Sequence, residues 1–139
     1  MATKVSTDGP LARALERVGD RWMLLIVDAL MSGPRRFNDL QADVSGIAPN
    51  ILSERLRRLA AEGIVVARPY SHRPLRYTYE LTATGGELAG VLRLLAGWAG
   101  GPDAEPLRHP ECGTPMEARW YCPTCARVVD DDEAELRYV

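Results

Sequence analysis

Residues 49–81 decide the fold of this chain, and they read P-N-I-L-S-E-R-L-R-R-L-A-A-E-G-I-V-V-A-R-P-Y-S-H-R-P-L-R-Y-T-Y-E-L. Leucines recur at helical spacing in the first half, which predicts a helix over about residues 49–62 that ends at Gly63. The spacing then changes to alternation, which predicts strands at residues 64–68 and 76–81. Because a polar, basic tip joins these strands, we expect them to form a hairpin.

Three helices are expected before this stretch. Apolar residues at helical spacing follow Pro10 and stop at Gly19, which predicts a first helix. Asp20 is a suitable N-cap for a second helix over residues 21–31. This second helix is apolar on nearly every face, so we expect it to be buried on most sides, as the central helix of the bundle or as part of a dimer interface. A short third helix is expected over about residues 36–42.

A last helix follows the hairpin, capped by Thr82 or Thr84 and running to about Trp98. The resulting order is helix, helix, short helix, turn, helix and basic hairpin. This is the layout of a winged helix-turn-helix, in which the helix before the hairpin enters the DNA major groove. The predicted fold class is therefore mainly α with a small β-hairpin wing.

Composition and charge narrow the class of protein. The chain is 46% hydrophobic and 26% charged, as is usual for a globular protein. No apolar run approaches the length of a membrane span, and residues 1–10 lack the apolar centre of a signal peptide. We therefore expect a cytoplasmic protein without membrane contact. No phosphate-binding loop, nucleotide fingerprint or Ser/His/Asp set is present, so we expect no enzyme activity.

Charge is unevenly distributed along the chain, although its net value is only −2. Residues 11–99 hold 12 arginines against 9 acidic residues, whereas residues 100–139 hold 4 arginines against 9 acidic residues. The body is thus mildly basic and the tail is acidic. This distribution permits a DNA-binding face on the body without requiring one.

The third and fourth helices and the hairpin carry the candidate DNA-binding residues. A helix with short or polar side chains on one face fits the major groove, and a basic hairpin can reach the neighbouring backbone or minor groove. The alternative is that the arginines only form a solvated face, but the position of the hairpin favours DNA binding. The candidates are Arg36, Pro49, Asn50, Ser53, Glu54, Arg57, Arg58, His72, Arg73 and Arg76.

Four motifs follow one another along the body: V-G-D-R-W-M-L-L-I-V-D-A-L at 18–30, R-R-F-N-D-L at 35–40, I-A-P-N-I-L-S-E-R-L-R-R-L at 47–59 and R-Y-T-Y-E-L-T-A-T-G at 76–85. Together they resemble the HxlR-type winged helix regulators of bacteria over residues 11–99. The resemblance implies a homodimeric, DNA-binding transcriptional regulator that uses the first and last helices as its dimer interface. It also implies a structural role for Arg21 and Trp22, a DNA-backbone contact by Arg36, and groove reading by residues 48–58.

One feature departs from this family. Many relatives carry Cys-Pro just before the first helix, and in several of them the thiol senses oxidants or electrophiles. The corresponding dipeptide here is Gly9-Pro10, and residues 11–99 contain no cysteine. That thiol switch is therefore not expected, and an effector of unidentified chemistry would have to act in another way.

All three cysteines lie in the tail, within H-P-E-C-G and C-P-T-C-A. His109, Cys112, Cys122 and Cys125 thus form two pairs, each spaced i, i+3 across a turn. Such pairs are typical of tetrahedral zinc, so we predict a structural Zn(II) ion in a zinc-ribbon-like tail. If His109 is not a ligand, water or Glu111 could take its place. Free thiols and a redox pair of Cys122 and Cys125 are the alternatives.

The sequence therefore predicts a transcriptional regulator that binds a two-fold symmetric operator as a homodimer. The alternative is a metal- or redox-responsive regulator, or a protein-interaction module, that acts through the Cys/His tail. The expected organisation is an N-terminal arm, a DNA-binding and dimerisation domain, a linker and the tail, at residues 1–10, 11–99, 100–106 and 107–139.

Overall fold

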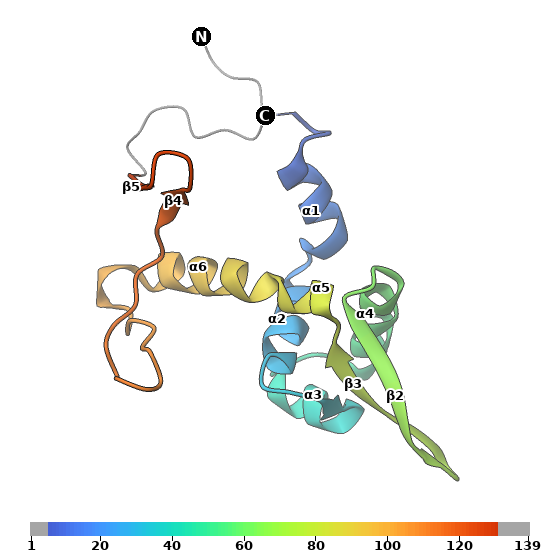
Figure 1. Cartoon of the computed structure of the whole chain (residues 1–139). Coiled ribbons are helices and arrows are strands. Elements are labelled where there is room, and N and C mark those ends of the chain that lie inside the picture. The colour runs from blue at the N-terminus through green and yellow to red at the C-terminus, as the bar shows by residue number, and fades with distance from the viewer. Residues whose placement is uncertain (1–5, 131–139) are drawn as a thin grey trace. The chain divides into compact units, whose positions relative to one another are not determined.

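The computed structural model describes residues 6–130 in two compact units, one ending at Arg93 and the other beginning at Leu94. The first unit contains α1 (Pro10–Val18), α2 (Arg21–Leu30), β1 (Arg35–Arg36), α3 (Phe37–Asp43), α4 (Pro49–Ala61), β2 (Val65–His72), β3 (Leu75–Leu81), α5 (Ala83–Gly86) and the start of α6 (Leu88–Gly100) (Figure 1). The second unit contains the rest of α6, the 3-10 turn η1 (Gly101–Asp103), β4 (Trp120–Cys122) and β5 (Arg127–Val129). Part of the predicted tail, residues 131–139, lies outside the described residues, as do residues 1–5 of the arm.

Helix α2 is the centre of the first unit. The Asp20 carboxylate accepts hydrogen bonds from the backbone N–H groups of Trp22 and Met23 at 3.0 and 3.3 Å, which confirms Asp20 as its cap. Leu25 is an exception to the expected burial, because it is 43% exposed. The buried hydrophobic core contains Met23, Ile26, Val27, Leu30, Leu40, Val44, Ile47, Leu52, Leu56, Leu59, Ile64 and Val65.

The predicted hairpin is present, and it belongs to a three-stranded antiparallel sheet of order β1-β3-β2. Strand β1 was not predicted, because its two residues carry no periodic pattern. It pairs Arg35 with Tyr79 and Arg36 with Thr78 on β3. This pairing attaches the start of α3 to the root of the hairpin, which projects from the body in Figure 1.

The predicted single helix to Trp98 is wrong, because the chain forms two helices, α5 and α6. Thr82 caps α5 by accepting the backbone N–H of Gly85 at 3.1 Å. A Cβ atom at Gly85 would lie 2.2 Å from the carbonyl oxygen of Ile64, the residue before β2. Only glycine therefore allows α5 to lie this close to the Ile64 backbone. Only Glu87 separates α5 from α6, which begins at Leu88.

The second unit has little interior. No residue from 101 to 130 is buried, and β4 and β5 form a ladder of three residue pairs. Trp98, near the end of α6, is 83% exposed in the described chain, whereas an apolar helical face predicts a covered side chain. No helix within residues 6–130 has the length and apolar character needed to cross a membrane.

Candidate nucleic-acid interface

The exposed face of α4 carries the predicted groove-reading residues. Pro49 starts the helix from the N-cap Ala48, and three leucines at helical spacing are buried on its inner face. Because these leucines fix the rotation of the helix, the predicted groove residues are presented to solvent. They are Pro49, Asn50, Ser53, Glu54, Arg57 and Arg58, and each of them is exposed.

An ion pair connects α4 to the cap of α2. Arg55 donates from Nε and Nη2 to the two carboxylate oxygens of Asp20, both at 3.1 Å. This hydrogen-bonded contact with Arg55 lowers the pKa of Asp20. Arg55 also contacts Glu54 at 3.0 Å, so the carboxylate of Glu54 is already partnered within the protein. Two predicted groove residues, Arg57 and Arg58, form no ion pair within residues 6–130, and their guanidinium groups are available to a ligand.

The wing presents its basic residues at and near its tip. His72 pairs with Leu75 across the turn that contains Arg73, and Ser71 pairs with Arg76. All three predicted wing residues, His72, Arg73 and Arg76, are exposed. Arg68, further down the hairpin, forms an ion pair with Glu80 on the neighbouring strand.

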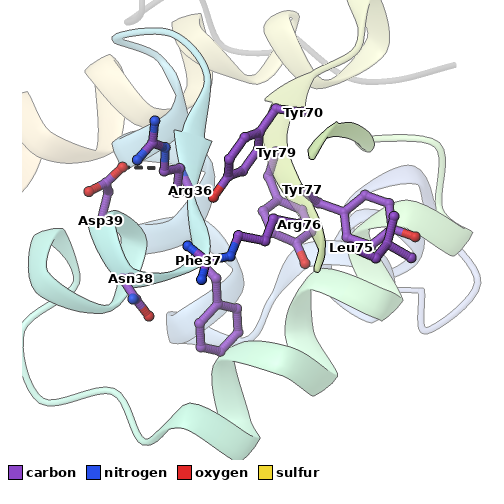
Figure 2. A pocket seen from close by; sticks show the side chains of 9 residues that line it. All are labelled: Arg36, Phe37, Asn38, Asp39, Tyr70, Leu75, Arg76, Tyr77 and Tyr79. Carbon is purple, nitrogen blue, oxygen red and sulfur yellow. Dashed lines mark hydrogen bonds between the residues drawn. The ribbon is translucent and has the colours of Figure 1, made fainter. Parts of the chain in front are cut away.

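A hollow of about 510 Å³ lies between the start of α3 and the hairpin. Figure 2 shows the residues of β1 and α3 on one side and those of β2 and β3 on the other. Burial raises the pKa of the Tyr79 hydroxyl, and neighbouring Tyr77 adds to this effect, so Tyr79 is neutral at physiological pH. The lining residues are Arg36, Phe37, Asn38, Asp39, Tyr70, Leu75, Arg76, Tyr77 and Tyr79.

Arg36 and Arg76 bring two guanidinium groups to this hollow. The guanidinium of Arg36 lies 4.8 Å from the ring centroid of Tyr70, and its backbone N–H donates to Asp39 at 3.2 Å. Neither arginine has a carboxylate partner among residues 6–130. The hollow therefore combines positive charge with aromatic walls between α3 and the hairpin.

Comparisons with known proteins agree with this geometry. The family described as HxlR-like helix-turn-helix matches residues 17–103. The chain belongs to the HxlR-like helix-turn-helix family. An uncharacterized HTH-type transcriptional regulator of Mycobacterium bovis, Mb3122, is 38% identical to it over 125 residues, which cover 86% of this chain and 78% of that protein.

Solved structures of similar fold match different shares of the chain. Reduced YodB, a transcriptional regulator of Bacillus subtilis, has a TM-score of 0.60 at 30% identity and covers 70% of this chain and 98% of its own. The Pseudomonas aeruginosa protein PA1374 has a TM-score of 0.68 at 33% identity and covers 94% of this chain and 92% of its own. This HxlR-like protein is thus a DNA-binding transcriptional regulator with a winged helix-turn-helix, and its relatives are regulators, not enzymes.

The predicted metal ligands of this HxlR-like protein lie in two separate turns. His109 Nδ1 is 3.4 Å from Cys112 Sγ in the first turn. Hydrogen bonding to Thr114 lowers the pKa of Cys112, and hydrogen bonding to Cys125 lowers the pKa of Cys122 in the second turn. Within residues 6–130, no three His, Cys, Asp or Glu side chains lie close enough together to hold a metal ion. The structure therefore forms each pair but does not bring the two pairs to one centre.

Sequence reasoning missed the aromatic part of the interface. Pro69 pairs with Tyr77 and Ser71 pairs with Arg76, which leaves Tyr70 as an extra residue in a β-bulge. The bulge gives Tyr70 its position against Arg36. Pro69 was the available signal, since proline within a strand often marks a bulge.

Proposed function

We propose that this regulator binds a two-fold symmetric operator as a homodimer, with α4 in the major groove and the hairpin on the adjoining backbone. The observation that carries the proposal is the exposed polar face of α4 next to the basic hairpin. An α-helix fits the major groove, where each base pair presents a distinct set of hydrogen-bond donors and acceptors.

The roles within α4 follow from the partners of each side chain. Arg57 and Arg58 have no carboxylate partner in residues 6–130, so their donors are available to guanine edges or phosphates. Asn50 and Ser53 occupy the N-terminal part of the same exposed face, where short side chains allow close approach to bases. Glu54 is held by Arg55 and is better suited to excluding unsuitable bases than to strong binding.

The phosphate contacts are assigned to Arg36, Arg73 and Arg76. Two of them, Arg36 and Arg76, line the hollow between α3 and the hairpin, where a phosphodiester group can accept from both guanidinium groups. His72 lies at the tip with Arg73 and can reach the minor groove or the backbone. These contacts supply affinity and salt dependence, whereas α4 supplies sequence specificity.

The homodimer is inferred from apolar side chains that the single chain leaves uncovered. Neither α1 nor α6 contains a buried residue. Yet Leu11 and Leu15 on α1 are 64% and 58% exposed, and Leu95 and Trp98 on α6 are 45% and 83% exposed. Apolar surface on two terminal helices is typical of an interface between copies, and a two-fold dimer would match a symmetric operator.

The test compares Arg57→Ala with the unmodified protein on two duplexes. The first is the site recovered by selection from a random duplex pool, and the second is a random duplex of the same length. We expect Arg57→Ala to weaken the free energy of binding to the selected site by about 1–3 kcal/mol, and to random DNA by much less, because base contacts carry specificity. An equal loss on both duplexes would contradict the groove-reading role of Arg57.

A second candidate function is regulation through the tail by metal or redox state. It is favoured by the presence of all three cysteines in a unit without buried residues from 101 to 130. Operator affinity measured before and after treatment with a chelator separates the candidates. An unchanged affinity would leave the tail a structural or protein-interaction segment, whereas a large change with an intact body would identify a sensor. The cytoplasmic location and the unidentified effector stay predictions.

A further inference from the structure

The two cysteine-containing turns of the second unit have the same construction. Each consists of a metal-ligand residue, a proline, one further residue and a cysteine. In each, the residue after that cysteine has a positive φ: 69° at Gly113 and 53° at Ala126. Alanine rarely adopts this conformation, and it is retained where the surrounding structure requires it. The second turn thus repeats the first even where the residue type does not favour it.

A small hairpin surrounds each turn. Around the first, His109 donates its backbone N–H to Thr114 at 2.9 Å, and Met116 donates to Leu107 at 2.7 Å. Around the second, β4 and β5 pair Cys122 with Arg127 and extend from there. A ligand pair at the tip of each of two hairpins is the arrangement of structural zinc sites of the ribbon type.

The distance within the first pair agrees with metal geometry. Tetrahedral angles with Zn–S and Zn–N bonds of about 2.3 and 2.0 Å place the two ligand atoms ~3.5 Å apart. The observed separation of His109 Nδ1 and Cys112 Sγ is 3.4 Å. In the absence of metal this contact is a hydrogen bond, and zinc could replace it with little movement of either side chain.

The part of the second unit that holds these turns has almost no hydrophobic interior. From residue 101 to residue 130 no side chain is buried, and the β4–β5 ladder has three pairs. A two-stranded ladder alone is marginally stable in water, and small units of this kind depend on a disulfide, a metal or association. Four potential ligands in two preformed turns favour the metal.

We propose that His109, Cys112, Cys122 and Cys125 bind one structural Zn(II) ion, which joins the two turns. In the described chain the pairs are separate, so binding would bring the second turn against the first through the exposed segment between them. Three thiolates and a neutral imidazole bound through Nδ1 complete the tetrahedral set. Such a set leaves no open position for a catalytic water.

The test measures zinc in the full-length protein purified under reducing conditions, and the absorption of the Co(II)-substituted form. We expect one zinc per chain and a tetrahedral Co(II) spectrum with thiolate charge-transfer bands. His109→Ala should weaken zinc binding at least about tenfold, since loss of even an outer partner of a ligand costs 10–100-fold. His72→Ala is the matched control, because the chain has two histidines, and it should retain full zinc content.

Cys122→Ser gives a second measurement that does not depend on His109. It should abolish the tetrahedral Co(II) spectrum and leave the helical circular dichroism of the body unchanged. Hydrogen exchange of the amides in residues 107–129 should slow when zinc is added to the unmodified apo-protein. Absence of zinc and of a tetrahedral Co(II) spectrum in the unmodified protein would overturn the proposal. Equal zinc affinity in His109→Ala and His72→Ala would also overturn the four-ligand site.

Discussion

Replacing Asp20 with alanine tests the ion pair that connects α2 to α4. The change removes the acceptor that caps α2, which is worth about 1 kcal/mol. It also removes both hydrogen bonds from Arg55, whose side chain is 16% exposed against 30% for Asp20. Partial exposure limits this contribution to about 1 kcal/mol. The expected loss in the free energy of unfolding is therefore about 2 kcal/mol, or a fall in Tm of roughly 8–16 °C.

Two variants separate the cap from the charge. Asp20→Asn retains a capping oxygen but loses the carboxylate, so its free energy of unfolding should fall by about 1 kcal/mol. Asp28 lies on the exposed side of the same helix and has no ion-pair partner in residues 6–130. The free energy of unfolding of Asp28→Ala should therefore stay close to that of the unmodified protein. Urea unfolding followed by circular dichroism provides the free energies. Surface substitutions usually change the free energy of unfolding by less than about 0.5 kcal/mol. If the free energies of unfolding of Asp20→Ala and Asp28→Ala differ by no more than this, Asp20 does not have the stabilising role given to it here.

The same contact fixes a dependence on pH. The pKa of Asp20 in the folded state lies below its ordinary value of 3.8, chiefly because Arg55 donates hydrogen bonds to it. A lowered folded-state pKa gives stability that is fully present above the unfolded-state pKa and is lost as the pH falls through the folded-state pKa. The difference between Asp20→Asn and the unmodified protein should thus be constant near pH 7 and shrink below about pH 4. A difference that grows with acidification would contradict this account.

Three further predictions concern the wing, the dimer and α5. Arg76→Ala should weaken binding to all duplexes alike and reduce the slope of log K against log salt by about 1, measured by fluorescence anisotropy; a loss confined to the selected site would contradict a phosphate contact. Trp98→Glu should prevent formation of the proposed dimer, so that light scattering gives the monomer mass and operator affinity falls; a dimer that persists in this variant would show that Trp98 does not belong to the interface. Gly85→Ala should lower the free energy of unfolding by about 1–3 kcal/mol, because its Cβ would lie 2.2 Å from the Ile64 carbonyl oxygen; an unchanged urea midpoint would show that α5 can move away.

Local sequence patterns were sufficient to predict the helices and the hairpin that carry the candidate DNA-binding residues. The capping role of Asp20, the start of α4 at Pro49 and the hairpin each depend on residues near in sequence, and the structure confirms them. Leucine spacing predicted α4 itself, and the same leucines form its buried face in the structure. These inferences succeed because capping and periodicity are properties of one segment.

Features that depend on distant pairing were not predictable from these patterns. Strand β1 is defined by its pairing with β3, where Arg35 lies opposite Tyr79, and the hollow is lined by Arg36 and Tyr70, which are far apart in sequence. The close approach of Gly85 to the Ile64 carbonyl oxygen is also a contact between distant residues, which helical periodicity does not reveal. The single chain likewise leaves the apolar residues of α1 and α6 uncovered, because their proposed partner is a second copy.

The most direct test of the central claim is selection of duplex DNA from a random pool by the full-length protein, followed by sequencing and stoichiometry. We expect an inverted repeat whose half-sites lie about one helical turn, or ~10 base pairs, apart, with two protein chains bound per duplex. Recovery of no enriched motif, or of a single half-site bound by one chain, would contradict it.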